Sequence, residues 1–515
     1  MTEYNSRKLT IMDLDFRTRP TSTAVLLLAI AAAGVLAYRL LFHPLSRFPG
    51  PRLWAMTRLP WLYHTSSGRL FARLAQLHEQ YGPVVRTAPG ELSICSPTAW
   101  SDIYVSRPIM PKEPTGQTPP LNGAHSLFTA VGADHRRIRG AVVAGFSDKA
   151  LREMARGVEF HVDQFIARLK REIAQQGNVL DLHKFFGFAA LDTITDLSYS
   201  GSMHVLADRN ENDMIEGFFL HARFSTLRAC LAWCYPLDKI LDFLVLTLKR
   251  RQRSKNWAVF GGKIEARIDG KHEKGEQDWP DLLTPVLERT STGSKAEGRV
   301  TRQEILSHTL ASVIANSQLT SYTLAATTYL LLSNPPALKH AVQEIRSTFS
   351  SPDQITVAST QGLVYLSAVL NETMRLQHPT PSTLPRVVPP EGKVIDGISI
   401  PGNTIVGMNL HVMHTSPKFW VDPQSFHPER FLDRTDERYD PRFDGDVKTA
   451  FMPFSTGPRN CIGGKFFFTE AKTTLARLLY GFEMQLEGDT TGWLEGRAYI
   501  IYEPKQLWVR ISEFS

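Results

Sequence analysis

The residues around Cys461 have the types and the spacing of a metal-ligating loop. The stretch FMPFSTGPRNCIGGKFF, residues 451–467, places this cysteine among Gly, Pro and Ser residues, directly before an apolar run. A lone cysteine is usually a buried structural thiol. A ligating thiolate needs its charge stabilised, which backbone N–H groups and the N-terminus of a following helix can do. The run after Cys461, GGKFFFTEAKTTLARLLYGFEM, predicts such a helix.

The neighbours of Cys461 favour a ligand over a structural thiol. Gly457 and Gly463 allow the backbone to turn and to approach a flat cofactor closely. Phe454 can pack beside the ligand and keep water away from it. Arg459 suits an acidic group of the cofactor.

Two long helices are predicted to position this loop within one large domain. The first runs from about Thr301 to Asn334, begins with a Thr301–Glu304 capping box and ends before two prolines. The second, about Leu363 to Gln377, carries Glu372 and Arg375 on one face as a buried pair. Short strands are predicted near 84–96 and 386–410, with Gly, Pro and Asp-Gly turns between them.

These motifs together resemble the cytochrome P-450 superfamily, in particular its fungal microsomal members of secondary metabolism. The haem-binding loop of that superfamily, F-x-x-G-x-R-x-C-x-G, is matched at every fixed position by Phe454, Gly457, Arg459, Cys461 and Gly463. The resemblance implies a mostly α fold with small β-sheets. It also implies haem b as the cofactor, with Cys461 as the axial ligand of its iron.

Two further motifs extend the resemblance along the chain. Glu372-x-x-Arg375 matches the family's E-x-x-R helix, and FHPERF at 426–431 matches its meander. The resemblance implies that Glu372, Arg375 and Arg430 form a buried charge network that braces the haem-binding core. It also assigns haem-propionate contacts to four residues: His135, Arg139, Arg386 and Arg459.

The helix predicted at 301–334 departs from the family at the distal face of the haem. Members usually carry A-G-x-[DE]-T-T there, and the acid and the first Thr relay protons to dioxygen. This chain reads ANSQLT at 315–320, so Gln318 replaces the acid and Leu319 the Thr. The residues expected to shape the catalytic distal side are Asn316, Gln318, Leu319 and Thr320.

Three explanations of this departure stay open. A register error of one residue would make Thr320 the relay hydroxyl, substrate groups or ordered water could deliver the protons, or the enzyme omits standard oxygen activation. The preferred hypothesis is a monooxygenase that uses dioxygen and NADPH-derived electrons to oxidise a lipophilic intermediate, by an unusual reaction such as ring expansion, coupling or desaturation. The alternatives are an oxygen-independent haem-thiolate isomerase or dehydratase, and a haem carrier or sensor without turnover.

An uncharged segment near the N-terminus predicts a membrane anchor. Residues 20–38 would span roughly 28 Å as a helix, close to the thickness of the bilayer core. A cleaved signal peptide is the alternative, although its apolar region would be unusually long. Basic residues dominate the flank that follows, which predicts a cytosolic C-terminal part. The expected order is a lumenal N-terminus at 1–19, a single-pass anchor in the endoplasmic reticulum membrane at 20–38, a stiff, extended proline-rich hinge at 39–59 and a catalytic domain at 60–515.

The charge distribution bears on the partners of the chain. The net charge is +7, and the densest basic run, residues 249–255, lacks interleaved aromatic residues, which argues against nucleic-acid binding. Lys465 and the pair Arg136-Arg137 suit the docking of an acidic electron donor. By the resemblance, that donor is NADPH-cytochrome P-450 reductase.

Overall fold

The computed structural model of the chain describes residues 20–115, 120, 122–207, 212–248, 261–270, 279–292 and 300–514. The expected lumenal segment 1–19 and the basic run 249–255 lie outside these residues.

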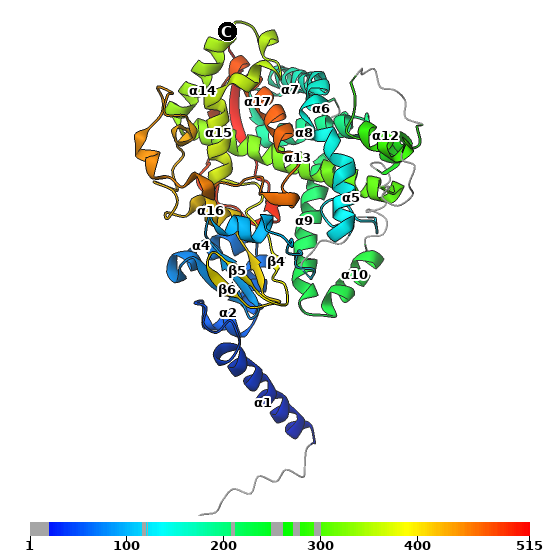
Figure 1. Cartoon of the computed structure of the whole chain (residues 1–515). Coiled ribbons are helices and arrows are strands. Elements are labelled where there is room, and N and C mark those ends of the chain that lie inside the picture. Colours follow the sequence, from blue (N-terminus) through cyan, green and yellow to red (C-terminus); the bar gives the residue numbers. More distant parts are fainter. Residues whose placement is uncertain are drawn as a thin grey trace, which may run out of the picture.

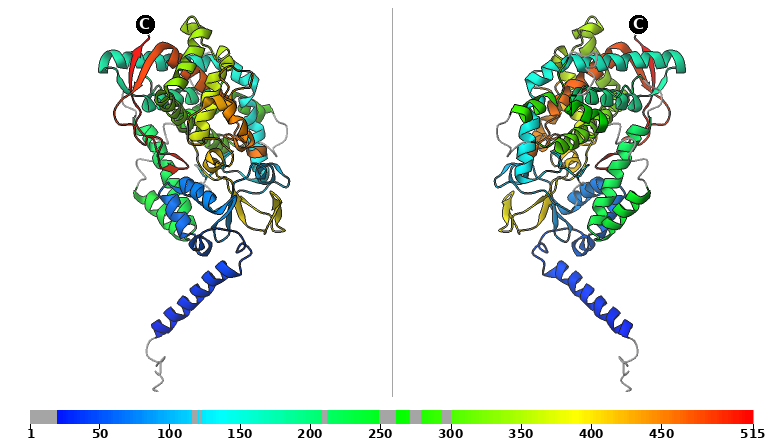
Figure 2. Two further views of the ribbon diagram at one scale, coloured as in Figure 1. Left: turned by 90° about the vertical axis from the view of Figure 1, so that its left-hand side faces the viewer. Right: turned by 90° about the vertical axis from the view of Figure 1, so that its right-hand side faces the viewer.

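A helical body packs on a smaller region rich in β-strand, and one helix projects from the strand-rich end (Figures 1 and 2). The main helices are α1 (Pro20–Leu41), α2 (Arg52–Met56), α3 (Leu59–Ser66), α4 (Leu70–Tyr81), α5 (Gly132–Val142), α6 (Asp148–Glu153), α7 (Ala155–Gln176), α8 (Leu182–Tyr199), α9 (Asn212–Ala232), α10 (Leu237–Leu248), α12 (Thr284–Thr292), α13 (Arg302–Ser333), α14 (Pro335–Thr348), α15 (Val364–Leu376), α16 (Leu410–Thr415) and α17 (Gly464–Gly481). The strands are β1 (Val84–Ala88), β2 (Glu91–Ile94), β3 (Val179–Asp181), β4 (Arg386–Val387), β5 (Lys393–Ile395), β6 (Ile398–Ile400), β7 (Ile405–Gly407), β8 (Phe482–Leu486), β9 (Ala498–Tyr499), β10 (Ile501–Tyr502) and β11 (Trp508–Glu513).

The strands form small separate sheets. The largest has the order β1-β2-β7-β4, in which β2 and β7 run parallel and pair Leu92 with Val406. A second sheet has the order β3-β11-β8, and β5–β6 and β9–β10 form two antiparallel hairpins. The mostly α fold with small sheets is therefore confirmed.

The central helix α13 is confirmed almost to the residue. The Thr301 hydroxyl accepts a hydrogen bond from the backbone N–H of Glu304, the Glu304 carboxylate accepts one from the backbone N–H of Thr301, and Asn334 ends the helix. The helix crosses the middle of the body (Figure 1) and packs along α8 and α15. Most of its side chains are buried, Ser and Thr residues among them, so protein covers nearly every face of the helix rather than one stripe.

The helix predicted as the anchor, α1, is longer than expected and runs to Leu41. Its segment Thr23–Leu41 has a mean hydropathy of 2.2 and no buried part, so it is long and apolar enough to cross a membrane. It is the one such helix found among the described residues.

The expectation of an extended link at 39–59 is wrong, because this segment packs on the first sheet. Leu45 and Trp54 are buried in the strand-side core, and residues 52–56 form α2. The buried Arg86 side chain donates to Arg39 O (2.9 Å), and its backbone N–H donates to Pro49 O (2.7 Å). Apolar burial and these bonds hold the chain here in a folded path, which proline stiffness alone does not predict.

Candidate active site

Two glycines hold the Cys461 loop in its shape. The backbone N–H of Cys461 donates to Phe454 O (2.9 Å) and closes the loop. Gly457 has a φ of +77°, and a Cβ atom there would lie 2.2 Å from Tyr104 O. A Cβ atom at Gly464 would lie 3.1 Å from the Phe454 ring. Larger residues at these positions would therefore push the loop away from its neighbours.

The Cys461 thiol lies at the start of α17, as expected. The backbone N–H groups of Gly463 and Gly464 donate to its sulfur, and they lower its pKa together with the positive charge of Arg139. Burial has the larger effect and raises the pKa. The side chain is accessible to solvent, yet protein surrounds it closely enough to cause this shift. The donors are thus in place for a thiolate, and a bound metal ion would remove its proton.

The donor set fits iron in a porphyrin ring. Among the described residues there is no group of three or more His, Cys, Asp or Glu side chains that could hold a metal ion. Cys461 would therefore need the other ligands of its metal from outside the chain. A haem supplies these ligands from its own ring.

Five basic side chains, here called the basic cluster, gather beside the Cys461 loop. They are Lys112, His135, Arg139, Arg386 and Arg459. Each of the other four members lowers the pKa of His135 by its charge, so the five lie close together. In the part of the chain that the structure describes, no member forms an ion pair with a carboxylate, and Arg459 Nη1 is buried without a hydrogen-bond partner.

The remaining hydrogen bonds of the basic cluster go mainly to backbone carbonyls. Arg139 donates to Asn460 O (2.8 Å), Arg459 to Ala130 O (2.8 Å) and Lys112 to Phe128 O (2.7 Å). Such contacts leave the positive charges uncompensated. Buried charges of one sign are costly unless an anion joins them, and the carboxylates of a haem would be such an anion.

Burial and mutual repulsion shift the pKa values of the basic cluster downward. Burial, followed by the neighbouring cations, lowers the pKa of His135 to about 4, so this residue is neutral at pH 7 and offers a ring N–H rather than a positive charge. The same causes lower the pKa of Lys112 to about 7 and that of Arg459 to about 10. Sequence reasoning missed Lys112, because a single lysine between prolines carries no motif.

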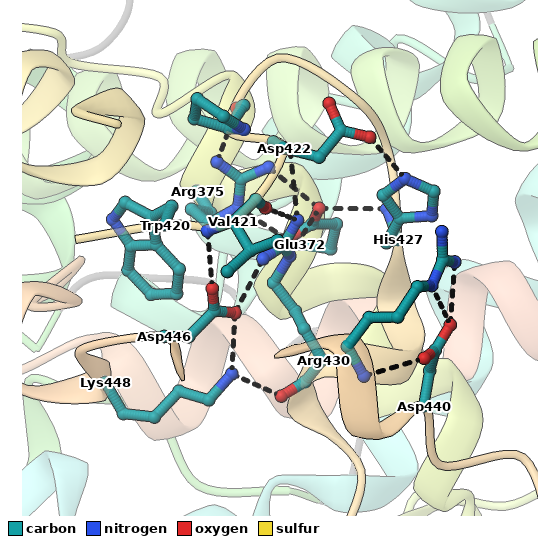
Figure 3. Close-up of polar contacts among 12 residues, drawn as sticks. Glu372, Arg375, Trp420, Val421, Asp422, His427, Arg430, Asp440, Asp446 and Lys448 are labelled. Carbon is teal, nitrogen blue, oxygen red and sulfur yellow. Dashed lines mark hydrogen bonds and ion pairs between the residues drawn. The ribbon is translucent and has the colours of Figure 1, made fainter. Parts of the chain in front are cut away.

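The predicted charge network is confirmed and is larger than expected. Glu372 accepts from Arg375 (2.7 and 2.8 Å) and from Arg430 (3.1 Å), and all three side chains are fully buried. Figure 3 shows Glu372 between the two arginines, with Asp446 on the far side of Arg430. Arg430 donates to Asp446 at 2.6 Å. Asp446 was missed because it belongs to none of the motifs.

The network satisfies its own charges. Arg375 also donates to three backbone carbonyls, those of His414, Pro423 and Ser425. Arg430 donates to the carbonyls of Val421 and Asp422. Every charge is thus paired or hydrogen-bonded, which a buried network requires.

The four predicted distal residues lie on α13, although they do not form one cluster. Asn316 points to α17, where its Nδ2 donates to Glu470 Oε2 (3.4 Å). Gln318 and Thr320 are buried, and Gln318 Nε2 has no hydrogen-bond partner. Leu319 is partly buried. Glu470 was not predicted, since a glutamate within an apolar helix gave no signal of its own.

The predicted docking cations differ in their surroundings. Arg136 is exposed, whereas Arg137 binds Glu304 (2.6 Å) and Asp134 (2.9 Å) and so ties α5 to the start of α13. Lys465 is exposed but forms an ion pair with Asp148 (2.6 Å). Arg137 is therefore a structural residue rather than a docking residue.

Comparison with known proteins identifies the family. The family model Cytochrome P-450 matches residues 48–505. The cytochrome P-450 monooxygenase atr2 of Stereocaulon alpinum is 33% identical over 483 residues, 92% of each chain. The cytochrome P-450 monooxygenase stcF of Emericella nidulans is 33% identical over 494 residues, 95% of this chain and 99% of the relative. Averantin hydroxylase of Dothistroma septosporum is 32% identical over 478 residues, 92% and 88% of the two chains.

The mostly α fold and the cysteine loop define a haem-thiolate class of protein, and the match covers nearly the whole chain. The chain belongs to the cytochrome P-450 family and is an oxidoreductase of the monooxygenase type found in fungal secondary metabolism.

Proposed function

We propose that the protein binds haem b through Cys461 and oxidises a lipophilic intermediate of fungal secondary metabolism with dioxygen and electrons from NADPH. The observation that carries this proposal is the combination at the Cys461 loop. Two backbone N–H groups point at the sulfur, and a basic cluster without carboxylate partners lies beside it. This arrangement suits a ring with a metal at its centre and carboxylates at its edge.

In this assignment the residues of the chain hold the cofactor in two ways. Cys461 would supply the thiolate that holds the iron, and the N–H groups of Gly463 and Gly464 would stabilise its charge. Arg459, Arg386, Arg139 and Lys112 would bind the propionates, and the neutral His135 would offer a ring N–H. The bound haem supplies the activation of dioxygen.

The names of the relatives support an oxidation. Averantin hydroxylase of Dothistroma septosporum is named for a hydroxylation, and atr2 and stcF are named monooxygenases. Gln318 and Leu319 stand where the family usually has its acid and Thr, so we expect an outcome other than simple hydroxylation, such as ring expansion, coupling or desaturation.

We place the protein on the endoplasmic reticulum membrane, with α1 as a single-pass anchor, residues 1–19 in the lumen and the domain 60–515 in the cytosol. Apolar side chains are exposed at the strand-rich end that carries α1, including Leu53, Leu59 and Tyr63 of α2 and α3. Tyr235, just before α10, and Phe243, in α10, are also largely exposed. The helix α10 itself lies toward that end of the molecule (Figure 1). Such a surface beside an anchor suits contact with lipid.

One experiment tests the function and separates the alternatives. The protein is reconstituted with NADPH-cytochrome P-450 reductase, and NADPH and dioxygen consumption are recorded with candidate lipophilic substrates. Product formation that depends on both supports the proposal. Turnover without either would favour an isomerase or dehydratase, the alternative that Gln318 and Leu319 support. Haem binding without any turnover would favour a carrier or sensor.

A further inference from the structure

A cavity lies between α4, the end of β2 and α16. Figure 1 shows α4 and α16 side by side where the helical body meets the strand-rich region. None of the residues that line the cavity belongs to the Cys461 loop, to the basic cluster or to α13. Its volume is about 200 Å³. A single water molecule needs only about 10–15 Å³, and a cavity of about 150 Å³ admits benzene. The space therefore suits a small organic molecule.

Two buried polar groups in the wall of the cavity already have partners. His78 Nδ1 donates to Gly82 O (2.9 Å), and its Nε2 accepts from the Ser93 hydroxyl (2.8 Å). Ser416 hydrogen-bonds to the thiol of Cys95. Burial lowers the pKa of His78 to about 4 and raises that of Cys95 to about 12, so both groups are neutral at pH 7. They add no charge to the cavity.

His411, which also lines the cavity, has an unused donor. Its ring packs edge-on against Phe71 with the ring centroids 5.0 Å apart. Neither ring nitrogen has a hydrogen-bond partner within the described ranges. Burial, followed by the charge of His378, lowers its pKa to about 4, so the ring is neutral and carries one N–H. An occupant of the cavity that accepts a hydrogen bond would satisfy this donor.

Lys418 brings a positive charge to the cavity. It is the one lysine or arginine in the lining, as far as the structure describes the chain, and its exposed ammonium group forms no ion pair there. After burial, its charge is among the causes that lower the pKa values of His78 and Cys95, so it lies close to the buried wall. Glu79 also lines the cavity, yet it is exposed and does not pair with Lys418.

We propose that this cavity binds a small carboxylate whose apolar body is about the size of benzene. The carboxylate accepts from the Lys418 ammonium group and from the ring N–H of His411, which makes the contact charge-assisted. Ala75, Pro83 and Val412 line the cavity with apolar surface for the body of the ligand. The site is separate from the Cys461 loop, so the inference goes beyond the proposed function and does not depend on it.

Benzoate is a suitable probe, because it combines a carboxylate with a benzene ring. Isothermal titration calorimetry of the full chain should show one saturable site for benzoate. Benzamide has nearly the same size but no charge, and it should bind at least about 10-fold more weakly, as expected for the loss of a hydrogen bond between charged groups. No saturable binding of benzoate, or equal affinities for the two compounds, would overturn the proposal.

Variants of the lining locate the bound benzoate. Lys418→Met should lower the affinity about 10- to 100-fold, whereas the equally exposed Lys339→Met on α14 is the matched control and should bind as wild type. Ala75→Phe should abolish binding because its ring fills the cavity, and circular dichroism checks that this variant is folded. Equal affinities of Lys418→Met and wild type would place the benzoate elsewhere and overturn the proposal.

The sign of the ligand charge is tested at Glu79. Glu79→Gln removes the carboxylate of the lining and should raise the affinity for benzoate a few-fold at low salt. A lower affinity in Glu79→Gln would contradict a carboxylate ligand. Cys461→Ala should bind benzoate as wild type does, because Cys461 is not part of this cavity. Absence of turnover with intact benzoate binding would therefore count against the proposed function alone.

Discussion

Two groups of buried charges in this molecule differ in whether the chain itself supplies the opposite charges. One group is complete in this sense and the other is incomplete. In the network around Glu372, the carboxylates and carbonyls of the chain pair with Arg375 and Arg430 (Figure 3). In the basic cluster around Arg459, the described chain supplies backbone carbonyls but no carboxylate ion pair.

This difference distinguishes buried charges that stabilise the fold from buried charges that are suited to bind a ligand. A network whose charges are all satisfied needs nothing further and fixes the fold around α15. A cluster of like charges has lowered pKa values because its members repel one another, and it becomes favourable only when an anion arrives. The same residue type, arginine, thus stabilises the fold in one place and, in the proposed function, binds the cofactor in the other.

The largest effect is expected from breaking the complete network. Glu372→Ala leaves Arg375, Arg430 and the backbone N–H of His427 without their shared acceptor. We expect the free energy of unfolding to fall by about 3–5 kcal/mol and little folded protein to form. Urea unfolding followed by circular dichroism measures this, with the exposed Glu437→Ala as the control. A loss below 1 kcal/mol would mean that the network is not a brace.

The incomplete cluster should respond in the opposite manner. Arg459→Met removes one of several repelling charges and one hydrogen bond, so the unfolding free energy of the haem-free protein should change by less than about 1 kcal/mol. Haem should dissociate more readily, with an affinity about 10- to 100-fold lower, as expected for the loss of a charge-assisted contact. Haem transfer to apomyoglobin reports this. Exposed Arg434→Met is the control, and equal affinities in Arg459→Met and wild type would contradict the assignment.

The pH dependence of the haem-free protein sharpens the comparison. The folded-state pKa of Lys112 is about 7, below its ordinary value of 10.5, so the unfolded chain binds more protons between these two pH values. Stability should therefore rise with pH across this window through Lys112. Lys112→Met should remove that rise, as should bound haem, whose carboxylates would keep the lysine charged. Urea unfolding at several pH values tests this; identical slopes in wild type and Lys112→Met would refute it.

The smallest effect is expected from the exposed Arg136, which we propose as a contact for the reductase. Arg136→Glu should raise the KM for the reductase a few-fold at low salt and have little effect at high salt, because exposed charges are screened. Arg137→Met should instead lower stability, since it separates α5 from Glu304. If Arg136→Glu shows no salt-dependent effect on KM, the reductase docks elsewhere.

Much of this architecture could be predicted from the sequence where a local rule decides it. The ends of α13 follow from a capping box and from prolines, and α15 and α17 follow from their apolar periodicity and the motifs they carry. The network of Glu372, Arg375 and Arg430 followed from the family motifs.

Other features depend on contacts between distant segments and could not be predicted. The folded path at 39–59 depends on Arg86, and Lys112 joins the basic cluster only because its backbone pairs with that of Arg386. The neutral state of His135 arises from the charges around it. Glu470 on α17 contacts Asn316 on α13 only because these two helices pack together.

The central claim is that Cys461 ligates haem iron as a thiolate. The ferrous carbon monoxide spectrum of the full chain tests it most directly. A thiolate-ligated haem should give a red-shifted Soret band in wild type and in Cys234→Ala, and the band should be lost in Cys461→Ala. A wild type without this band, or a band that persists in Cys461→Ala, would show that Cys461 is not the ligand.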